Sequence, residues 1–336
     1  MVDVLSIQER KNEYSFLAEH KHLGDNLCLV GFGGSYAYGT NTETSDVDIR
    51  GFATRTADEI LLGTDYEQIV VQHDDVDTTI YSLDKMFHLL AGCNPNMIEM
   101  LGLLPEHYLY LNEIGKRVIE NRKIFLSQRC IQTFGGYATQ QLYRIQQKSL
   151  SAISELEYQT HIKRVLEGMS EHLEQRYGLS AEQISPEIAD DGSLKLNVSA
   201  QVDAKALSGI LGEINKTIQD YYKPSKRNKK ALEHGKITKH SMHLIRLYLM
   251  VIDLLLEGEI VTYRANEHDL LMSIRNGAFL DTDGKPSNDF FDLVREYEDK
   301  FESAKRKTKL PVEPDTKAID ELRLIINRHV VKDLYF

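Results

Sequence analysis

The stretch that decides the fold reads LCLVGFGGSYAYGT over residues 27–40 and SDVDIRGF over residues 45–52. Its apolar start predicts a strand, and the glycine-rich turn that follows opens a short helix. The second segment predicts another strand, on which side chains alternate between two faces. Asp46 and Asp48 therefore point to one face, and Val47 points to the other, toward a core. The sequence thus predicts two carboxylates beside a loop rich in backbone amides.

The glycine turn and the two aspartates suit a metal-bound polyphosphate. Glycines let the backbone approach phosphates closely, and amides at the start of a helix favour negative charge. Magnesium takes carboxylate oxygens, and two such ions roughly 3.5–4 Å apart can activate a hydroxyl and stabilise a leaving pyrophosphate. We therefore assign Gly33, Gly34 and Ser35 to nucleotide binding, and expect two Mg²⁺ or Mn²⁺ ions at the aspartates.

A third carboxylate is expected from another strand, and Asp77 is the candidate. It lies in VDTTIY at residues 76–81, with strand-forming residues on both sides. Asp74 and Asp75 compete for the role, but they fall in the turn before this strand and are expected to face solvent. The predicted catalytic and metal-binding carboxylates are Asp46, Asp48 and Asp77.

These features resemble the DNA polymerase β-like nucleotidyltransferase superfamily. Later blocks narrow the resemblance to the RNA-repair-pathway polymerase-β family, over nearly the whole chain. The blocks are RG at 50–51, NPNMIEML at 94–101, YATQQL at 137–142, HLIRL at 243–247, IRNG at 274–277 and LP at 310–311. The resemblance implies template-independent transfer of a nucleoside monophosphate from a triphosphate such as ATP to an acceptor hydroxyl. The favoured acceptor is an RNA end, such as that of a transfer RNA under repair.

In the predicted reaction, the acceptor hydroxyl attacks the α-phosphorus and pyrophosphate leaves, while Asp77 can accept the hydroxyl proton. Two alternatives stay open. The first keeps the chemistry and changes the acceptor to a protein, a small molecule or a second nucleotide. The second is a non-catalytic nucleotide-binding regulator, which would bind with magnesium and release no pyrophosphate.

A helix predicted over residues 238–257 carries a second group of candidates. Lys239, His243 and Arg246 follow at offsets of four and three, and therefore share a stripe. Arginine suits bidentate phosphate contacts and lysine acts as a point charge, so we assign these side chains to nucleotide binding. The alternative is a charged stripe that faces solvent or pairs with acids. Arg50 likewise either pairs with a carboxylate or reaches a phosphate.

The charge distribution limits the kind of nucleic-acid contact. A net charge of −11 argues against a protein that coats nucleic acid generally. A basic segment at residues 223–239 interrupts this acidity and predicts a loop that leads into a helix. It is either a solvated loop or a guide for phosphates of nucleotide or RNA.

The composition agrees with a soluble enzyme, and the length of the chain is enough for two domains. The chain has 336 residues, of which 42% are hydrophobic and 27% charged. We expect no membrane span and no secretion signal at the N-terminus. Cys28, Cys93 and Cys130 show no metal-ligand spacing and indicate reduced, buried thiols in a cytoplasmic protein.

The pattern along the chain predicts an α+β protein. A small mixed-sheet nucleotidyltransferase core is expected over residues 1–125, and a mainly α-helical domain that closes the cleft over residues 126–336. We interpret the polar stretch 182–201 as a mobile insertion that could contain one hairpin. The predicted helices span residues 6–20, 58–62, 83–90, 131–148, 152–176, 204–222, 238–257, 267–276, 288–306 and 316–329.

Overall fold

The chain forms two compact units, each built from segments that are distant in sequence. The structure is a computed structural model that describes residues 17, 20, 23–43, 45–73, 76–148, 183–188, 194–199, 203, 206–212, 237–282 and 284–332. Unit 1 comprises Met1–Cys130, Asp253–His268 and Lys309–Phe336, and unit 2 comprises Ile131–Ile252 and Asp269–Thr308. The chain therefore leaves unit 1 after residue 130 and returns to it twice. The predicted domains, with a single boundary near residue 125, place both returning segments in the second domain.

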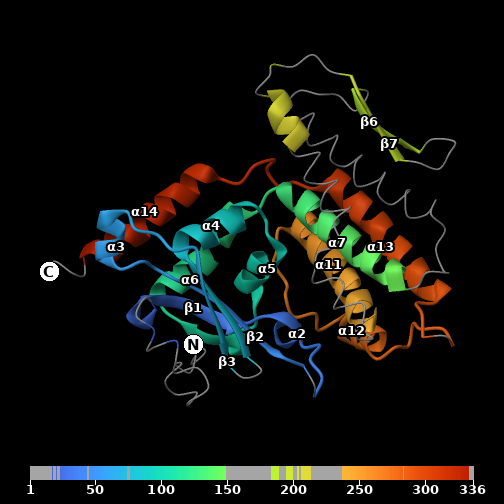
Figure 1. The fold of residues 1–336 in the computed structure, drawn as a ribbon, viewed down its shortest axis with the longest axis horizontal. Coiled ribbons are helices and arrows are strands. Elements are labelled where there is room, and N and C mark those ends of the chain that lie inside the picture. The colour runs from blue at the N-terminus through green and yellow to red at the C-terminus, as the bar shows by residue number, and fades with distance from the viewer. Residues whose placement is uncertain are drawn as a thin grey trace. The chain divides into compact units, whose positions relative to one another are not determined.

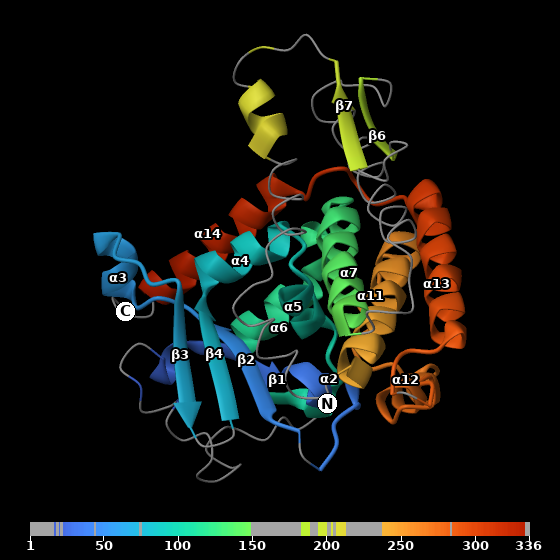
Figure 2. The ribbon, with the colours of Figure 1, turned by 45° about the vertical axis from the view of Figure 1, so that its right-hand side comes forward.

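Unit 1 is built around a five-stranded mixed sheet in the order β3-β4-β2-β1-β5, most of which is visible in Figure 2. The strands are β1 (Leu27–Phe32), β2 (Val47–Ala53), β3 (Gln68–His73), β4 (Val76–Ser82) and β5 (Tyr108–Leu111). β2 and β4 run parallel, and every other neighbouring pair is antiparallel. The mixed sheet predicted for this part of the chain is therefore confirmed.

Helices cover the sheet of unit 1 on one face, and others lie at its ends (Figure 2). α4 (Leu83–Ala91), α5 (Pro95–Ile98) and α6 (Glu113–Glu120) lie on one of its faces (Figure 2). α14 (Thr316–Lys332), from the end of the chain, packs against α4 and against α3 (Ala57–Leu62) (Figure 1). α2 (Gly34–Tyr38) follows β1 directly. Short 3₁₀ turns occupy Gly24–Asn26 (η1), Glu99–Gly102 (η2), Pro105–His107 (η3) and Arg122–Phe125 (η4).

Polar side chains fix where these helices begin. Thr56 accepts a hydrogen bond from the amide of Glu59, whose carboxylate accepts one from the amide of Thr56, so that α3 starts with a capping box. Ser82 caps α4 in the simpler way. Asn112 caps α6 and also donates to the carbonyl of Leu27, so the helix start is tied to β1.

The alternation of side chains divides the sheet into two faces. Ile49, Ala53 and Ile80 are fully or almost fully buried on one face, where they pack in a core with Leu17 and Leu23. The other face carries the even-numbered side chains of β2, which include Asp48. Ile49 and Ala53 thus anchor the strand, whereas Asp48 and Arg50 lie on the other face, where Phe52 is fully buried further along.

Unit 2 is mainly helical. Its helices are α7 (Arg129–Lys148), α11 (Ile237–Glu257), α12 (His268–Arg275) and α13 (Asn288–Lys307), with first or last residues of α7, α11 and α12 in unit 1, and residues 206–212 are also helical. Tyr248 of α11 donates a buried hydrogen bond to Glu298 of α13. Gly135 of α7 lies against the ring of Phe301, which is also on α13. α13 therefore packs against both α7 and α11.

The structure tests several predictions only in part, because some of the predicted elements lie outside the described residues. The hairpin expected in the 182–201 insertion is confirmed, because β6 (Ile184–Ile188) pairs antiparallel with β7 (Leu194–Val198). The predicted helix at 152–176 lies outside the described residues, as do most of the helix at 6–20 and the basic segment through residue 236. Within the described part of the chain, no helix has the length and apolarity that a membrane crossing requires.

Candidate nucleotide site

Asp48 and Asp77 lie directly opposite one another in the parallel pair of β2 and β4. Partners in a parallel pair point to the same face of the sheet, so the backbone register brings these two carboxylates together. Asp46 precedes β2 by one residue, and the alternation predicts the same face for it. Asp46 and Asp77 are exposed, and Asp48 is half-buried. Two of the three predicted carboxylates therefore come from neighbouring strands that are far apart in sequence.

The glycine turn lies against Asp48. The amide of Gly33 donates to the carbonyl oxygen of Asp48 at 2.8 Å. Gly34 has φ +54°, and a Cβ at this position would lie 1.9 Å from Asp48 Oδ2. Glycine is therefore required here for its backbone conformation and for the close approach of the carboxylate. Ser35, half-buried, follows in the first turn of α2.

Glu99, which was not predicted as a site residue, connects β2 with the helix α2 that follows the glycine turn. It is 0% exposed, its Oε1 accepts from Arg50 Nη1 at 3.0 Å, and its Oε2 accepts from the hydroxyl of Tyr38. Burial by itself lowers the pKa of Arg50, but the nearby negative charges, above all that of Glu99 and also that of Asp48, outweigh it and the pKa is raised. Of the two roles considered for Arg50, pairing with a carboxylate is the one observed. Glu99 belongs to the NPNMIEML block, where it is the one acid and lies between the apolar residues Ile98 and Met100.

The returning segment Asp253–His268 of unit 1 holds the far side of α2. His268 Nε2 donates to the carbonyl of Gly39 at 2.8 Å, and the ring of Tyr263 packs where a Cβ on Gly39 would lie. Thr262 Oγ1 donates to the backbone carbonyl of Glu99 at 2.6 Å. The helix after the glycine turn and the backbone of Glu99 are thus fixed by a stretch more than 160 residues further along the chain.

The predicted basic stripe lies in unit 2, on α11. Arg246 is 0% exposed and its Nη2 donates to His243 Nδ1 at 3.1 Å. The His243 ring packs edge-on against Tyr137 of α7 with 5.4 Å between centroids, and Lys239 is half-buried. The structure thus brings His243 and Arg246 together within the helical packing of unit 2. Their contact with a triphosphate, like that of Lys239, stays a prediction.

Comparison with known proteins identifies the family. The chain matches the RNA repair pathway DNA polymerase beta family over residues 9–324. The chain belongs to this family. The resemblance to polymerase-β-like nucleotidyltransferases is therefore confirmed, and family membership supports an enzyme that transfers nucleotides.

Two individual proteins are similar to parts of the chain. An uncharacterized 38.9 kDa protein from the nrdC-mobD intergenic region of Enterobacteria phage T4 is 29% identical over 136 residues, or 37% of this chain. The match spans 40% of the length of that relative. A nucleotidyltransferase-like protein from Exiguobacterium sibiricum aligns over 73% of this chain and 76% of its own, with 11% identity and a TM-score of 0.28. Neither similarity assigns a role to a residue.

The donor set of this family member suits a hard divalent cation. Asp48 and Asp77 are brought together by register, and carboxylate oxygens are the ligands that magnesium and manganese prefer. The glycine at position 34 keeps the space beside Asp48 Oδ2 clear of a side chain. Among the described residues, no three His, Cys, Asp or Glu side chains are grouped closely enough to hold a metal ion. Joint binding by Asp46, Asp48 and Asp77 therefore stays a proposal.

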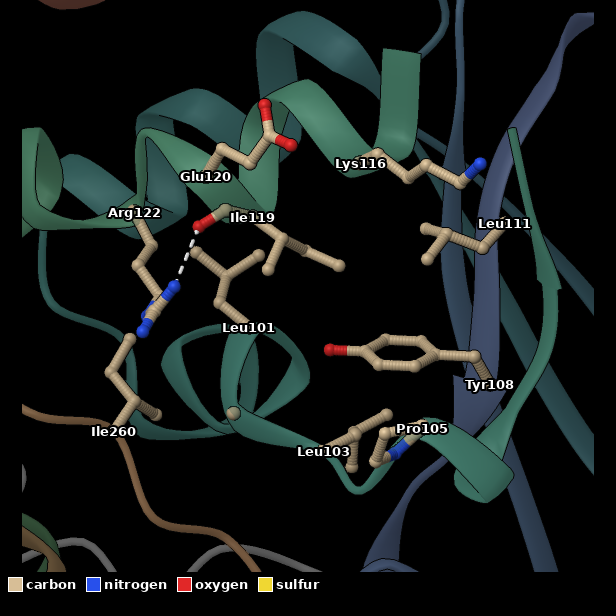
Figure 3. A pocket seen from close by; sticks show the side chains of 11 residues that line it. Leu101, Leu103, Pro105, Tyr108, Leu111, Lys116, Ile119, Glu120, Arg122 and Ile260 are labelled. Atoms are coloured by element: carbon tan, nitrogen blue, oxygen red, sulfur yellow. Dashed lines mark hydrogen bonds between the residues drawn. The ribbon is translucent and has the colours of Figure 1, made fainter. Parts of the chain in front are cut away.

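A separate pocket of about 440 Å³ opens in unit 1 between α6, β5 and η2 (Figure 3). Its walls are largely apolar, and Tyr108 projects into it with its hydroxyl bonded to the carbonyl of Met100 at 3.0 Å. Arg122 Nη1 donates to the carbonyl of Ile119 at 3.1 Å on one side. None of the predicted catalytic or nucleotide-binding residues lines this pocket, so it is distinct from the candidate nucleotide site.

Proposed function

We propose that this protein is a metal-dependent, template-independent nucleotidyltransferase. It moves a nucleoside monophosphate from a nucleoside triphosphate to an acceptor hydroxyl and releases pyrophosphate. The observation that carries the proposal is the pairing of Asp48 with Asp77 beside a glycine turn that only glycine can form. Membership of a polymerase-β-like family supports the same chemistry.

The roles of the residues follow from their positions. Gly34 and Ser35 receive the phosphates of the triphosphate, ATP among the candidates, through backbone amides and the serine hydroxyl. Asp46, Asp48 and Asp77 would hold Mg²⁺ or Mn²⁺, which when bound neutralises charge on the reacting phosphate and lowers the pKa of the attacking hydroxyl. Asp77, which is exposed, accepts the proton of the acceptor hydroxyl. Lys239, His243 and Arg246 belong to the proposal as further phosphate contacts.

The proposed acceptor is an RNA end, in particular a transfer-RNA-like end under repair. The description of the family supports this choice, and the basic segment at residues 223–239 supplies charge of the right sign for an RNA backbone. We also infer a cytoplasmic location, because all three cysteines are free and buried, as is usual in a reducing compartment.

The proposal is tested by incubating the protein with each α-labelled nucleoside triphosphate, magnesium or manganese, and total cellular RNA. The Asp46→Ala/Asp48→Ala variant is treated in parallel, and the products are resolved on a gel. Label on an RNA band that is absent with the variant is the expected result, and it names the nucleotide and the size of the acceptor. Label on protein or on a small product keeps the chemistry and replaces the acceptor. Nucleotide binding without any labelled product contradicts the transferase and favours a regulator.

A further inference from the structure

Glu99 joins the strand that carries the aspartates to the helix that follows the glycine turn. One oxygen of its carboxylate accepts from Arg50, two residues after Asp48 on β2. The other accepts from Tyr38, three residues after Ser35 on α2. The Glu99 carboxylate is 0% exposed, and the Arg50 side chain that pairs with it is 21% exposed. A single buried charge therefore fixes both elements of the candidate site.

Arg50 and Asp48 are neighbours on the same face of β2. A Cβ added to Gly33 would meet Asp48 Cβ and Arg50 Cγ, each at 3.4 Å, so both side chains flank the same point of the turn. If the Glu99 carboxylate were removed, the guanidinium of Arg50 would therefore have the carboxylate of Asp48 within reach. Losing one partner of a buried ion pair is costly, so Arg50 would turn to that carboxylate.

We propose that Glu99 is a positioning residue for the transfer reaction, a role that rests on the proposed function. It holds the guanidinium of Arg50 by Nη1 and thereby preserves the Asp48 carboxylate as a metal ligand. Through Tyr38 it also holds α2 in the position that places Ser35 and the glycine turn for the triphosphate.

The backbone around Glu99 has support that does not depend on its side chain. Thr262 Oγ1 donates to the main-chain carbonyl of Glu99 at 2.6 Å, and this bond survives a substitution at position 99. Glu99→Gln keeps the size of the side chain and removes its charge. The variant therefore changes the electrostatic pairing of Arg50 while η2 stays anchored.

The experiment measures Mn²⁺ affinity by titration calorimetry, without nucleotide or RNA, for the full-length protein and its variants. We expect Glu99→Gln to weaken Mn²⁺ binding about tenfold or more, because Arg50 then competes for Asp48. The double variant Arg50→Gln/Glu99→Gln, which lacks the competing cation, should return to within about threefold of the wild type. Tyr38→Phe should leave Mn²⁺ affinity unchanged, and in a separate titration with ATP it should bind the triphosphate more weakly than the wild type does.

The outcomes separate this inference from the proposed function. If the wild type binds Mn²⁺ and Glu99→Gln binds it equally well, Glu99 has no positioning role, while the proposed function stands. If Arg50→Gln/Glu99→Gln binds Mn²⁺ no more tightly than Glu99→Gln does, competition by Arg50 for the Asp48 carboxylate is excluded. If the wild type binds no Mn²⁺ without nucleotide, this inference fails, and the product assay still decides the proposed function. Should Glu99→Gln not fold, Glu99→Asp replaces it, because the shorter carboxylate cannot contact both partners and should also weaken Mn²⁺ binding.

Discussion

Asp48 on β2 and Asp77 on β4 are direct partners across a parallel strand pair, although 28 residues separate them. Parallel pairing requires a crossover between the strands, and here α3 and β3 lie between β2 and β4 in the chain. The two carboxylates are therefore held by backbone hydrogen bonds on both sides, and their separation does not depend on a flexible loop. β2, which carries Asp48, therefore lies directly beside β4, which carries Asp77, the third proposed metal ligand.

The glycine at position 34 provides the first prediction. Gly34→Ala should lower the transfer rate about 100-fold, because the new Cβ would lie 1.9 Å from Asp48 Oδ2 and displace the carboxylate. Initial rates with a labelled triphosphate measure this effect.

The matched control is Gly63→Ala. Gly63 also has a positive φ, +68°, but its Cβ would meet nothing within 4 Å. Gly63→Ala should lower the free energy of unfolding and leave the transfer rate unchanged. Equal rates for the two variants would show that displacement of Asp48 is not the cause.

The cysteines provide a second prediction. Burial raises the pKa of the Cys28 thiol to about 12, and Cys93 and Cys130 are also buried. At pH 8 the native protein should therefore react very slowly with a thiol reagent, and the urea-unfolded protein should react rapidly at all three thiols. Absorbance of the released chromophore measures both states. Rapid labelling of a native thiol would contradict the burial of these side chains.

His107 provides a prediction on pH and stability. Burial lowers the pKa of His107, and the charge of Glu106 only partly opposes this. Between the ordinary histidine pKa of about 6.5 and the lower folded value, the unfolded chain takes up a proton that the folded protein does not. The contribution of His107 to stability is thus present above pH 6.5 and is lost as the pH falls.

Urea unfolding at pH 7.5 and pH 5.5 measures this contribution. The variant His107→Gln should lose less stability over this interval than the wild type does. His88→Gln, at an exposed position on α4, is the control and should behave as the wild type. An unchanged pH dependence in His107→Gln would remove His107 as the source.

Local sequence patterns predicted much of the candidate site. Strand-forming residues around Asp77 correctly predicted its strand, β4. The face that alternation predicts for Asp46, shared with Asp48, stays a prediction, because Asp46 precedes β2. The alignment of Asp48 with Asp77 could not be predicted, because the register of a parallel pair depends on packing between distant segments.

Two other features lay beyond local patterns. The partners of Glu99 lie 61 and 49 residues away, so only its position in an apolar block distinguished it. Helical spacing correctly placed His243 and Arg246 on one stripe, but spacing does not say what covers a stripe. Arg246 proves to be buried and to donate to His243, and its contact with a phosphate stays a prediction.

Release of pyrophosphate is the measurement that tests the central claim most directly, because it does not depend on which acceptor is used. The protein is supplied with the four nucleoside triphosphates, magnesium and total cellular RNA, and pyrophosphate is quantified by a coupled assay. We predict release by the wild type and by Asp58→Asn, an exposed aspartate on α3, and a loss of about 100-fold or more in Asp48→Asn and in Asp77→Asn. Release at the wild-type rate by either of the last two variants, or nucleotide binding by the wild type without any release, would contradict the account.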